Sequence, residues 1–299
     1  MELKQIIEKI GSEYLEEKRK DIASNELAQF IRDAANNIKK FLPDYADYLV
    51  FRSSPGVHAT WSDVPWIAFM DPNITTSTQN GYYVVYLFSV DMKTVSLCLG
   101  QGITSILKEL GTEKAYKEFQ QRAQFIISRI PEGKNFFSQK PLDLKSSLSS
   151  SHRPKGYEKT CSYSKTYEIN SLPESDVLLF DLDKMLNLYL LLTSRGGVDK
   201  DLDPDDYSPE KFDQMDFTEK RKYKFHRVLE RNPSNSKKVK KIRGYNCELC
   251  GMNFTDTYGK IGEGYIEAHH LIPIHSLPEG KVIKFNVDDF RVLCSNCHK

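Results

Sequence analysis

Long apolar runs are missing from this sequence: none approaches the ~18–20 residues that a membrane-spanning helix requires. The first ten residues, MELKQIIEKI, mix charged and apolar side chains and lack the apolar core of a secretory signal. Net charge is also nearly absent, since 42 basic residues offset 41 acidic ones. We therefore expect a cytoplasmic protein that has no membrane partner and is not a polycation as a whole.

Cysteine and tryptophan are scarce, with six and two residues among 299. Disulfides are not expected in a reducing compartment. Four of the cysteines nevertheless form two C-x-x-C pairs, Cys247 with Cys250 and Cys294 with Cys297. Two such pairs supply the four thiolates of a tetrahedral structural Zn²⁺ site, whereas the alternative is four reduced thiols without a metal. Zinc is favoured, because residues 244–299 are too few to bury a large core.

Acidic residues are concentrated in one stretch of the chain and basic residues in the stretch that follows it. Residues 199–219 hold nine acidic and two basic side chains, and residues 220–243 hold eleven basic side chains and one acidic. The second stretch is a basic arm with the charge pattern of a nucleic-acid contact. We therefore predict a domain at 1–197, a charged linker with the basic arm at 198–243 and a small domain at 244–299.

The first domain shows both helical and strand patterns. Apolar residues recur at helical spacing over residues 1–42 and 103–130. Short β-type runs, split by Gly, Pro, Asn and Asp, fill residues 48–100. We expect further strands at 160–169 and 176–182, a Ser-rich loop at 138–156 and a helix at 183–194. The predicted fold class is α+β, with a mixed α/β domain built on a β-sheet or partial barrel with flanking helices.

Two adjacent histidines, His269 and His270, lie between the cysteine pairs, and His298 directly follows the last cysteine. Neighbouring residues on a strand point to opposite sides, so one imidazole can bind a metal while the other addresses a substrate. The segments CELCGMNF, GEGYIEAHHLIPIHSL and DDFRVLCSNCH closely resemble the HNH nuclease family, which has the ββα-metal fold. The resemblance covers residues 244–298.

This resemblance implies a small zinc-stabilised ββα-metal domain with a second, catalytic ion such as Mg²⁺, Mn²⁺ or Ni²⁺. His269 and His298 would be ligands of that ion, and His270 would be the general base that takes a proton from water. Asp289 falls where the family usually has its middle Asn and would fix the loop that carries the base. Members of the family generally have another histidine ligand beyond the position of Lys299, so a catalytically impaired, zinc-stabilised DNA-binding protein is an alternative.

A second resemblance lies in the N-terminal domain. The segments ATWSDVPWIAFMD, STQNGYYVVYLFSVD and LCLGQG resemble the MrcB-like N-terminal domain over residues 5–195. That family implies DNA binding, with a methylated or hydroxymethylated cytosine flipped into an aromatic pocket. Aromatic faces replace the stacking that a flipped base loses. By motif position, Trp66 and Tyr83 would be the walls of the pocket, and Leu87 would sense the 5-substituent. Trp61 and Tyr82 are second choices for the walls. His58 lies where relatives carry an aromatic wedge, and Tyr157 would close the pocket. Aromatic residues in strands are more commonly core, which is the alternative for each of them.

The two resemblances together predict a type IV, modification-dependent restriction endonuclease. Its partner would be double-stranded DNA that carries a modified cytosine, and cutting both strands with one active site per chain implies a homodimer or two binding events. One alternative is a nonspecific or structure-selective HNH nuclease. The other is the zinc-stabilised DNA-binding protein without activity.

Overall fold

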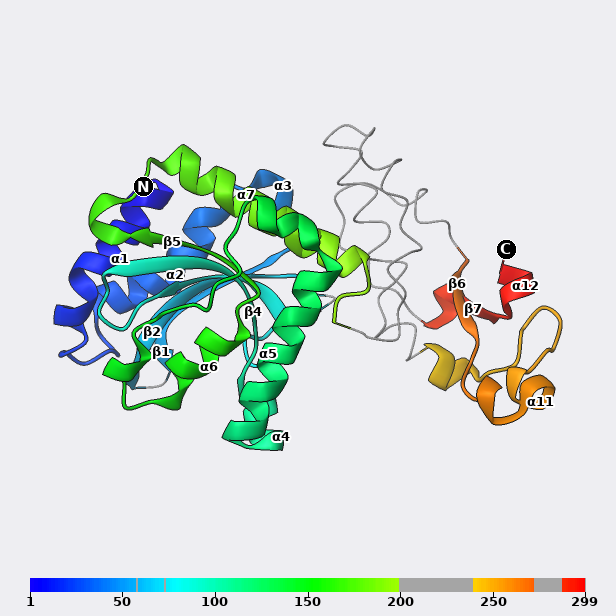
Figure 1. Cartoon of the computed structure of the whole chain (residues 1–299). Coiled ribbons are helices and arrows are strands. Elements are labelled where there is room, and N and C mark those ends of the chain that lie inside the picture. Colours follow the sequence, from blue (N-terminus) through cyan, green and yellow to red (C-terminus); the bar gives the residue numbers. More distant parts are fainter. Residues whose placement is uncertain (58, 73, 199–238, 272–286, 299) are drawn as a thin grey trace. The chain divides into compact units, whose positions relative to one another are not determined.

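The computed structural model of the chain divides into two compact units, Met1–Leu192 and Thr193–Lys299, and each is considered by itself (Figure 1). The structure describes residues 1–57, 59–72, 74–198, 239–271 and 287–298. No helix within these ranges is long and apolar enough to cross a membrane. Of the predicted linker at 198–243, only residues 198 and 239–243 fall inside the described ranges, so the acidic stretch and most of the basic arm lie outside them.

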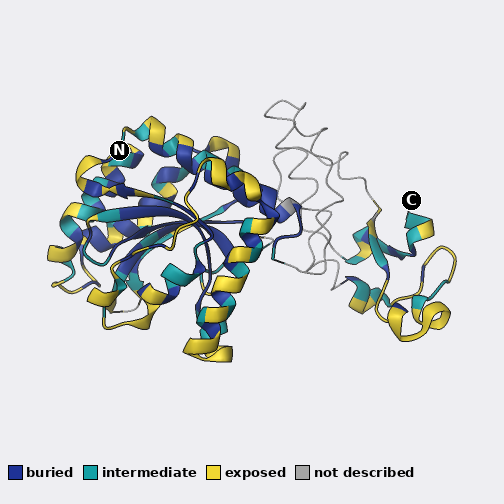
Figure 2. Ribbon diagram, viewed as in Figure 1, coloured by how far each residue is buried: buried dark blue, intermediate teal, exposed yellow. Residues whose placement is uncertain are grey.

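The first unit is built on an antiparallel sheet of five strands in the order β1-β2-β3-β4-β5, so each strand pairs with its neighbour in sequence. The strands are β1 Val50–Val57, β2 Thr60–Met70, β3 Tyr82–Phe88, β4 Thr94–Gln101 and β5 Tyr163–Glu168. β1 and β5 lie at opposite ends of this order, so the structure has a sheet and not a barrel. The strands are rich in aromatic and β-branched residues, which suit a sheet that is covered on both faces. Figure 2 shows β3 and β4 almost entirely buried.

Helices cover both faces of this sheet. They are α1 Leu3–Glu17, α2 Glu26–Lys39, α3 Pro43–Ala46, α4 Thr104–Leu110, α5 Thr112–Arg129, α6 His152–Thr160 and α7 Ser175–Ser194, with 3₁₀ turns η1 Pro131–Asn135, η2 Ser146–Leu148 and η3 Ile169–Ser171. The helical pattern predicted over residues 1–42 is confirmed. The Asn25 side chain caps α2 by accepting a hydrogen bond from the backbone N–H of Ala28. The pattern over 103–130 is split at Gly111, whose φ of 72° ends α4.

One face of the sheet packs against α2 and α7. Side chains alternate along a strand, so Tyr82 and Tyr86 of β3 point to the same face. The Tyr82 ring meets the ring of Tyr189 in α7 edge to face at 5.7 Å, and the Tyr86 hydroxyl donates to the carbonyl of Leu178, 3.5 Å away. On the same face, Lys39 of α2 lies 5.9 Å from the ring centre of Phe51.

The prediction of a strand at 176–182 is wrong, because these residues form the first part of α7. The run DVLLFDL is short and apolar, and periodicity alone does not separate such a strand from a buried helix segment. Over the whole helix, the fully buried residues follow one helical face, with steps of three or four residues and one adjacent pair: Leu178, Leu182, Met185, Leu186, Tyr189 and Leu192. The helix at 183–194 is confirmed as the rest of α7.

The opposite face of the sheet is covered by α6 and the segment that precedes it. The loop predicted at 138–156 extends to Ser151 apart from the short η2, and the prediction is wrong from His152, where α6 begins; Leu142 and Leu144 of this loop are buried against the sheet. The Glu158 carboxylate of α6 accepts hydrogen bonds from the backbone N–H groups of Leu144 and Ser146 at 2.9 and 3.2 Å. The serine-rich composition therefore does not prevent packing, because two leucines supply the apolar contacts.

The second unit has a small sheet in which β6 Glu267–His270 pairs antiparallel with β7 Phe290–Leu293. Its other elements are α11 Phe254–Tyr258, η5 Gly259–Gly262, η7 Val287–Asp289 and α12 Ser295–His298. Among the described residues of this unit, six buried side chains form one cluster, and two of them are cysteines: Val239, Cys247, Ile266, Phe290, Val292 and Cys294. The presence of two predicted zinc ligands in this cluster agrees with the expectation that a metal contributes to the stability of the unit.

Candidate functional site

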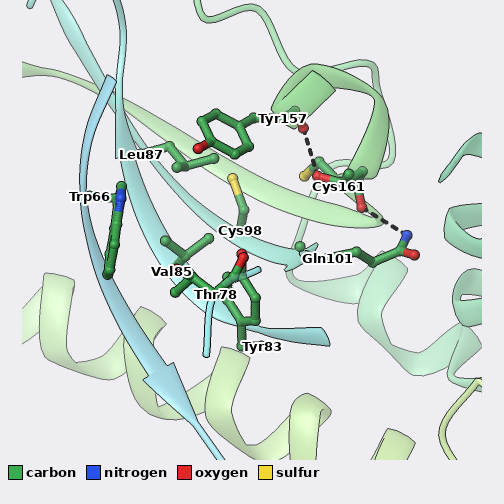
Figure 3. A pocket seen from close by; sticks show the side chains of 11 residues that line it. Trp66, Thr78, Tyr83, Val85, Leu87, Cys98, Gln101, Tyr157 and Cys161 are labelled. Atoms are coloured by element: carbon green, nitrogen blue, oxygen red, sulfur yellow. Dashed lines mark hydrogen bonds between the residues drawn. The ribbon is translucent and has the colours of Figure 1, made fainter. Parts of the chain in front are cut away.

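A cavity lies between the sheet of the first unit and helix α6 (Figure 3). Its lining comes from β2, β3, β4, α6 and the loop before β3: Trp66, Thr78, Tyr83, Val85, Leu87, Cys98, Gly100, Gln101, Tyr157, Thr160 and Cys161. Four of the predicted base-pocket residues, Trp66, Tyr83, Leu87 and Tyr157, are therefore brought together here.

Strand register explains this convergence. Trp66 in β2 stands directly opposite Leu87 in β3, and Tyr83 stands opposite Gly100 in β4. Tyr83, Val85 and Leu87 are alternate residues of one strand, so they face the same side. Gly100 has no side chain; a Cβ there would lie 3.6 Å from Val85 and 3.8 Å from Thr160, so the glycine leaves this part of the lining unfilled. The side-chain alternation of β3 could have predicted Val85 as a lining residue.

Polar groups at the cavity are anchored to the backbone. The Tyr83 hydroxyl donates to the carbonyl of Thr78 at 2.9 Å, and the Gln101 side-chain amide donates to the carbonyl of Thr160 at 3.2 Å. Burial raises the pKa of the Tyr83 and Tyr157 phenols, so both rings are neutral around pH 7. The cavity thus offers neutral aromatic and aliphatic faces with a few fixed polar groups.

The cavity is nearly closed in this conformation. Its volume is about 20 Å³, which is room for about one water molecule and too little for a nucleobase. Tyr157 is the half-buried wall that α6 contributes, and α6 is held to the preceding segment through Glu158. Admission of a planar ring therefore requires Tyr157 or Trp66 to move.

The second-choice pocket residues lie elsewhere. Trp61 is buried against α1, where its ring meets Tyr14 edge to face at 5.2 Å and its Nε1 donates to the carbonyl of Lys20 at 2.9 Å. Tyr82 points to the α7 face of the sheet. Neither lines the cavity. His58, the predicted wedge position, lies outside the described residues.

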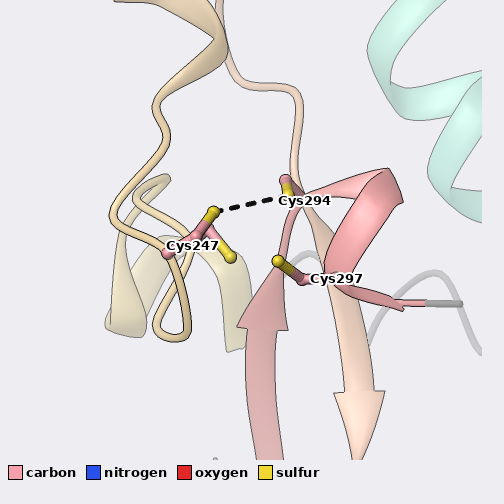
Figure 4. A group of neighbouring side chains, drawn as sticks. Cys247, Cys294 and Cys297 are labelled. Carbon is pink, nitrogen blue, oxygen red and sulfur yellow. Dashed lines mark hydrogen bonds between the residues drawn. The ribbon is translucent and has the colours of Figure 1, made fainter.

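The four predicted zinc cysteines of the second unit come together, and their sulfur atoms all lie within 4.8 Å of one another (Figure 4). The sulfurs of Cys250 and Cys294 are 3.7 Å apart. Sulfurs bound to one tetrahedral Zn²⁺ at about 2.3 Å stand about 3.8 Å from one another, so this arrangement fits a zinc ion. The two C-x-x-C pairs therefore form one group that could hold structural zinc.

Local electrostatics prepare this group for a cation. Burial raises the pKa of Cys247, but backbone N–H groups of Cys294, Cys250 and Leu249 outweigh it and lower the pKa to about 6. Hydrogen bonding with the sulfurs of Cys250 and Cys294 raises the pKa of Cys297 to about 12. Because four crowded thiols cannot all ionise without a positive charge among them, the site favours a bound cation.

The predicted catalytic residues lie on β6, η7 and α12. The rings of His269 and His298 are 5.1 Å apart and nearly perpendicular. In the β6–β7 pair, His269 stands opposite Arg291 and His270 opposite Phe290, but the side chain of His270 lies outside the described part of the structure. The backbone carbonyl of Asp289 accepts a hydrogen bond of 2.8 Å from Leu271, which ties η7 to the end of β6.

Glu267 is a further residue of this site. Its Oε2 lies 2.8 Å from Nδ1 of His298, and it shares one side of β6 with His269 because the two residues are two positions apart. The sequence could have indicated Glu267, because it is the first residue of the EAHH segment that carries the paired histidines. Within the described ranges, the four cysteines are the one group of three or more metal-binding side chains, so His269 and His298 do not by themselves complete a second site.

Comparison with known families adds one finding. The sequence profile described as "MrcB-like, N-terminal domain" matches residues 9–194, which is most of the first unit and more than half of the chain. A search of curated proteins found no match.

Proposed function

The chain belongs to the family described as MrcB-like, N-terminal domain, and on this premise we propose that it is a modification-dependent DNA endonuclease of the type IV restriction class. The first unit would select DNA that carries a methylated or hydroxymethylated cytosine. The second unit would hydrolyse phosphodiester bonds as an HNH nuclease. The predicted resemblance at 5–195 agrees with the match at 9–194.

One observation carries the reading role: Trp66, Tyr83, Leu87 and Tyr157 line one cavity in a domain of this family. A base that leaves the duplex loses stacking worth a few kcal/mol, and aromatic walls replace it. Leu87 lies beside Trp66 on the neighbouring strand, where it would contact a 5-substituent. The neutral phenols and the apolar Val85 suit an uncharged ring.

The cleavage role is supported by the order of elements β6, β7 and α12, which carries the paired histidines and His298 next to the four cysteines. Zinc held by the cysteines would stabilise the unit. A divalent ion bound by His269 and His298 would neutralise charge on the scissile phosphate. His270 would take a proton from the attacking water, and Glu267 would orient His298 through the 2.8 Å contact between its carboxylate and the imidazole.

The test is a cleavage panel with the full chain. The substrates are otherwise identical duplexes that carry cytosine, 5-methylcytosine, 5-hydroxymethylcytosine or glucosylated hydroxymethylcytosine, each with Mg²⁺, Mn²⁺ or Ni²⁺. The proposal expects cleavage of at least one modified duplex and none of the plain one. Equal cleavage of all four duplexes would instead identify a nonspecific or structure-selective nuclease.

One observation favours a second function, that of a DNA-binding protein without nuclease activity. Within the described residues, only two imidazoles meet at the predicted catalytic centre, so a zinc-stabilised DNA reader without nuclease activity is the alternative. It predicts tight and selective binding of modified DNA with no cleavage under any of the three metals. The same panel, read by both binding and cleavage, separates these outcomes.

A further inference from the structure

A second, open hollow of about 430 Å³ adjoins the cavity, and Trp66 and Thr78 line both. Its other walls come from α2, from β1 and from the loop before β3, and they include Arg32, Arg52 and Gln79. Trp66 therefore lies between the two spaces. The hollow is large enough for a ligand, unlike the cavity.

The hollow is positively charged. Arg32 and Arg52 are its two ionisable residues, and it has no acidic side chain in its lining. Neither guanidinium has an ion-pair or hydrogen-bond partner among the residues that the structure describes. Two unneutralised guanidinium groups at one hollow would attract an anion.

Strand register places this charge beside the cavity wall. Arg52 stands opposite Ala68, and Ser54 stands opposite Trp66, so Arg52 is two residues from the partner of Trp66 and faces the same side of the sheet. β1 is at the end of the strand order. Arg32 reaches the hollow from α2, which packs on the other face of β1. The two arginines therefore approach one space from the two sides of an edge strand.

We propose that this hollow binds the phosphodiester backbone of the DNA strand whose base enters the cavity, with Arg32 and Arg52 as its phosphate contacts. The inference rests on the proposed function and adds the location of the backbone. A nucleotide that inserts its base past Trp66 keeps its phosphates outside the cavity, and the hollow is the adjoining space. Guanidinium groups pair with phosphate oxygens through two parallel hydrogen bonds. Gln79, exposed at the rim, offers a further donor.

A stacked base is the competing occupant of the hollow. Its two aromatic side chains differ in their availability, because the ring of Phe51 already packs edge to face on Phe69 at 5.6 Å and beneath Lys39 at 5.9 Å. Trp66 is half-buried and is shared with the cavity. The hollow thus offers one ring face to a base, whereas it offers two guanidinium groups to an anion. A phosphodiester is therefore favoured over a stacked base as its occupant.

The experiment measures affinity of the full chain for plain and modified duplexes at several salt concentrations, without added divalent metal. The variants are Arg52→Gln, Arg32→Gln and the double variant. Lys9→Gln is the control, because it removes one positive charge from α1, away from the hollow. Each arginine variant should weaken both duplexes about fivefold and lower the slope of log affinity against log salt by about one. The control should change neither quantity.

The outcomes separate the inference from the function on which it rests. If the parent distinguishes modified from plain DNA but the arginine variants bind like the parent, the function stands and the backbone site is wrong. If the variants lose affinity for modified DNA alone with an unchanged salt slope, the hollow holds a base, and the inference is also wrong. If the parent binds both duplexes equally and the variants weaken both, the backbone site stands without the reading function. A parent that binds no DNA overturns both.

Discussion

Nδ1 of His298 lies 2.8 Å from Oε2 of Glu267, so the last described residue of α12 is tied to the first residue of β6. A carboxylate that accepts a hydrogen bond from one ring nitrogen fixes the tautomer of the imidazole and leaves the other nitrogen as a ligand. His269, the other predicted ligand, is 5.1 Å from His298 by ring centres. Glu267 is therefore a positioning residue in the proposed nuclease site.

Replacing Glu267 by Ala should lower the cleavage rate about 10- to 100-fold, because His298 loses the group that orients it. Glu267→Gln, which keeps a hydrogen-bond acceptor, should restore part of the rate. Glu263→Gln is the matched control, since Glu263 is an exposed acid of the same unit. Rates should be measured across pH together with zinc content; a loss of rate that comes with a loss of zinc would indicate a structural role instead.

The His270→Ala variant should lose cleavage and keep its fold, its zinc and its binding of modified DNA. The reason is that the proposed general base acts on water and does not hold the structural metal. Cleavage assays, elemental analysis and binding measurements on one preparation check the three parts. A variant that cuts as well as the parent would show that another group takes the proton.

Cys294→Ser should remove zinc and unfold the second unit while the first unit stays folded. Cys294 is buried in the small core of that unit and contributes one of its four sulfurs, so its loss removes both a ligand and a core contact. Cys161→Ser in the first unit is the matched control. Limited proteolysis and elemental analysis report the result, and full zinc occupancy in Cys294→Ser would contradict the four-cysteine site.

Zinc retention should depend on pH with a loss in the acid range. The pKa of Cys247 is lowered to about 6 in the folded chain, whereas an unfolded thiol titrates near pH ~8.5. A lowered folded pKa stabilises the fold fully above the unfolded value, and this stabilisation declines as pH falls and is lost below about 6. Dialysis against a fixed concentration of chelator at pH 8, 7, 6 and 5, followed by zinc analysis, should show a zinc content that falls with pH, because protons compete with the metal for the sulfurs. A zinc content that does not change with pH under these conditions would argue against a thiolate site.

The two tryptophans form a matched pair because they lie on the same strand in different surroundings. Trp66→Ala should weaken binding of modified DNA by about 1–3 kcal/mol, the usual cost of losing one stacked base, with a smaller effect on plain DNA. Trp61→Ala should instead lower the free energy of unfolding by about 3–5 kcal/mol, because Trp61 is buried against Tyr14. Binding and thermal unfolding should be measured for both. Equal loss of plain and modified binding in Trp66→Ala would assign it to the core.

Local patterns predicted most of the elements. The β-type runs that begin near Val50, Trp66 and Tyr82 are strands, because alternation and β-branched or aromatic residues act over a few neighbours. The strand prediction at 176–182 is wrong, because the helical periodicity of this run emerges only when it is joined to 183–194. The segment at 138–156 packs through two leucines whose partners on the sheet lie far away in sequence.

By itself, the sequence determined that four cysteines in two C-x-x-C pairs form one group, because the pairs depend on spacing along the chain, and that residues 9–194 belong to their family, because membership depends on the residues of that segment. It also determined that Tyr82 and Tyr83 point to opposite faces of a strand. Only the tertiary structure decided which face of the sheet holds the cavity. It thereby showed that Trp66 lines the cavity, whereas Trp61 packs against Tyr14. Packing likewise decided that Arg32 and Arg52 line one hollow. The physical reason is that alternation is a local property, whereas the choice of which helix covers which face depends on the burial of apolar surface between segments distant in sequence.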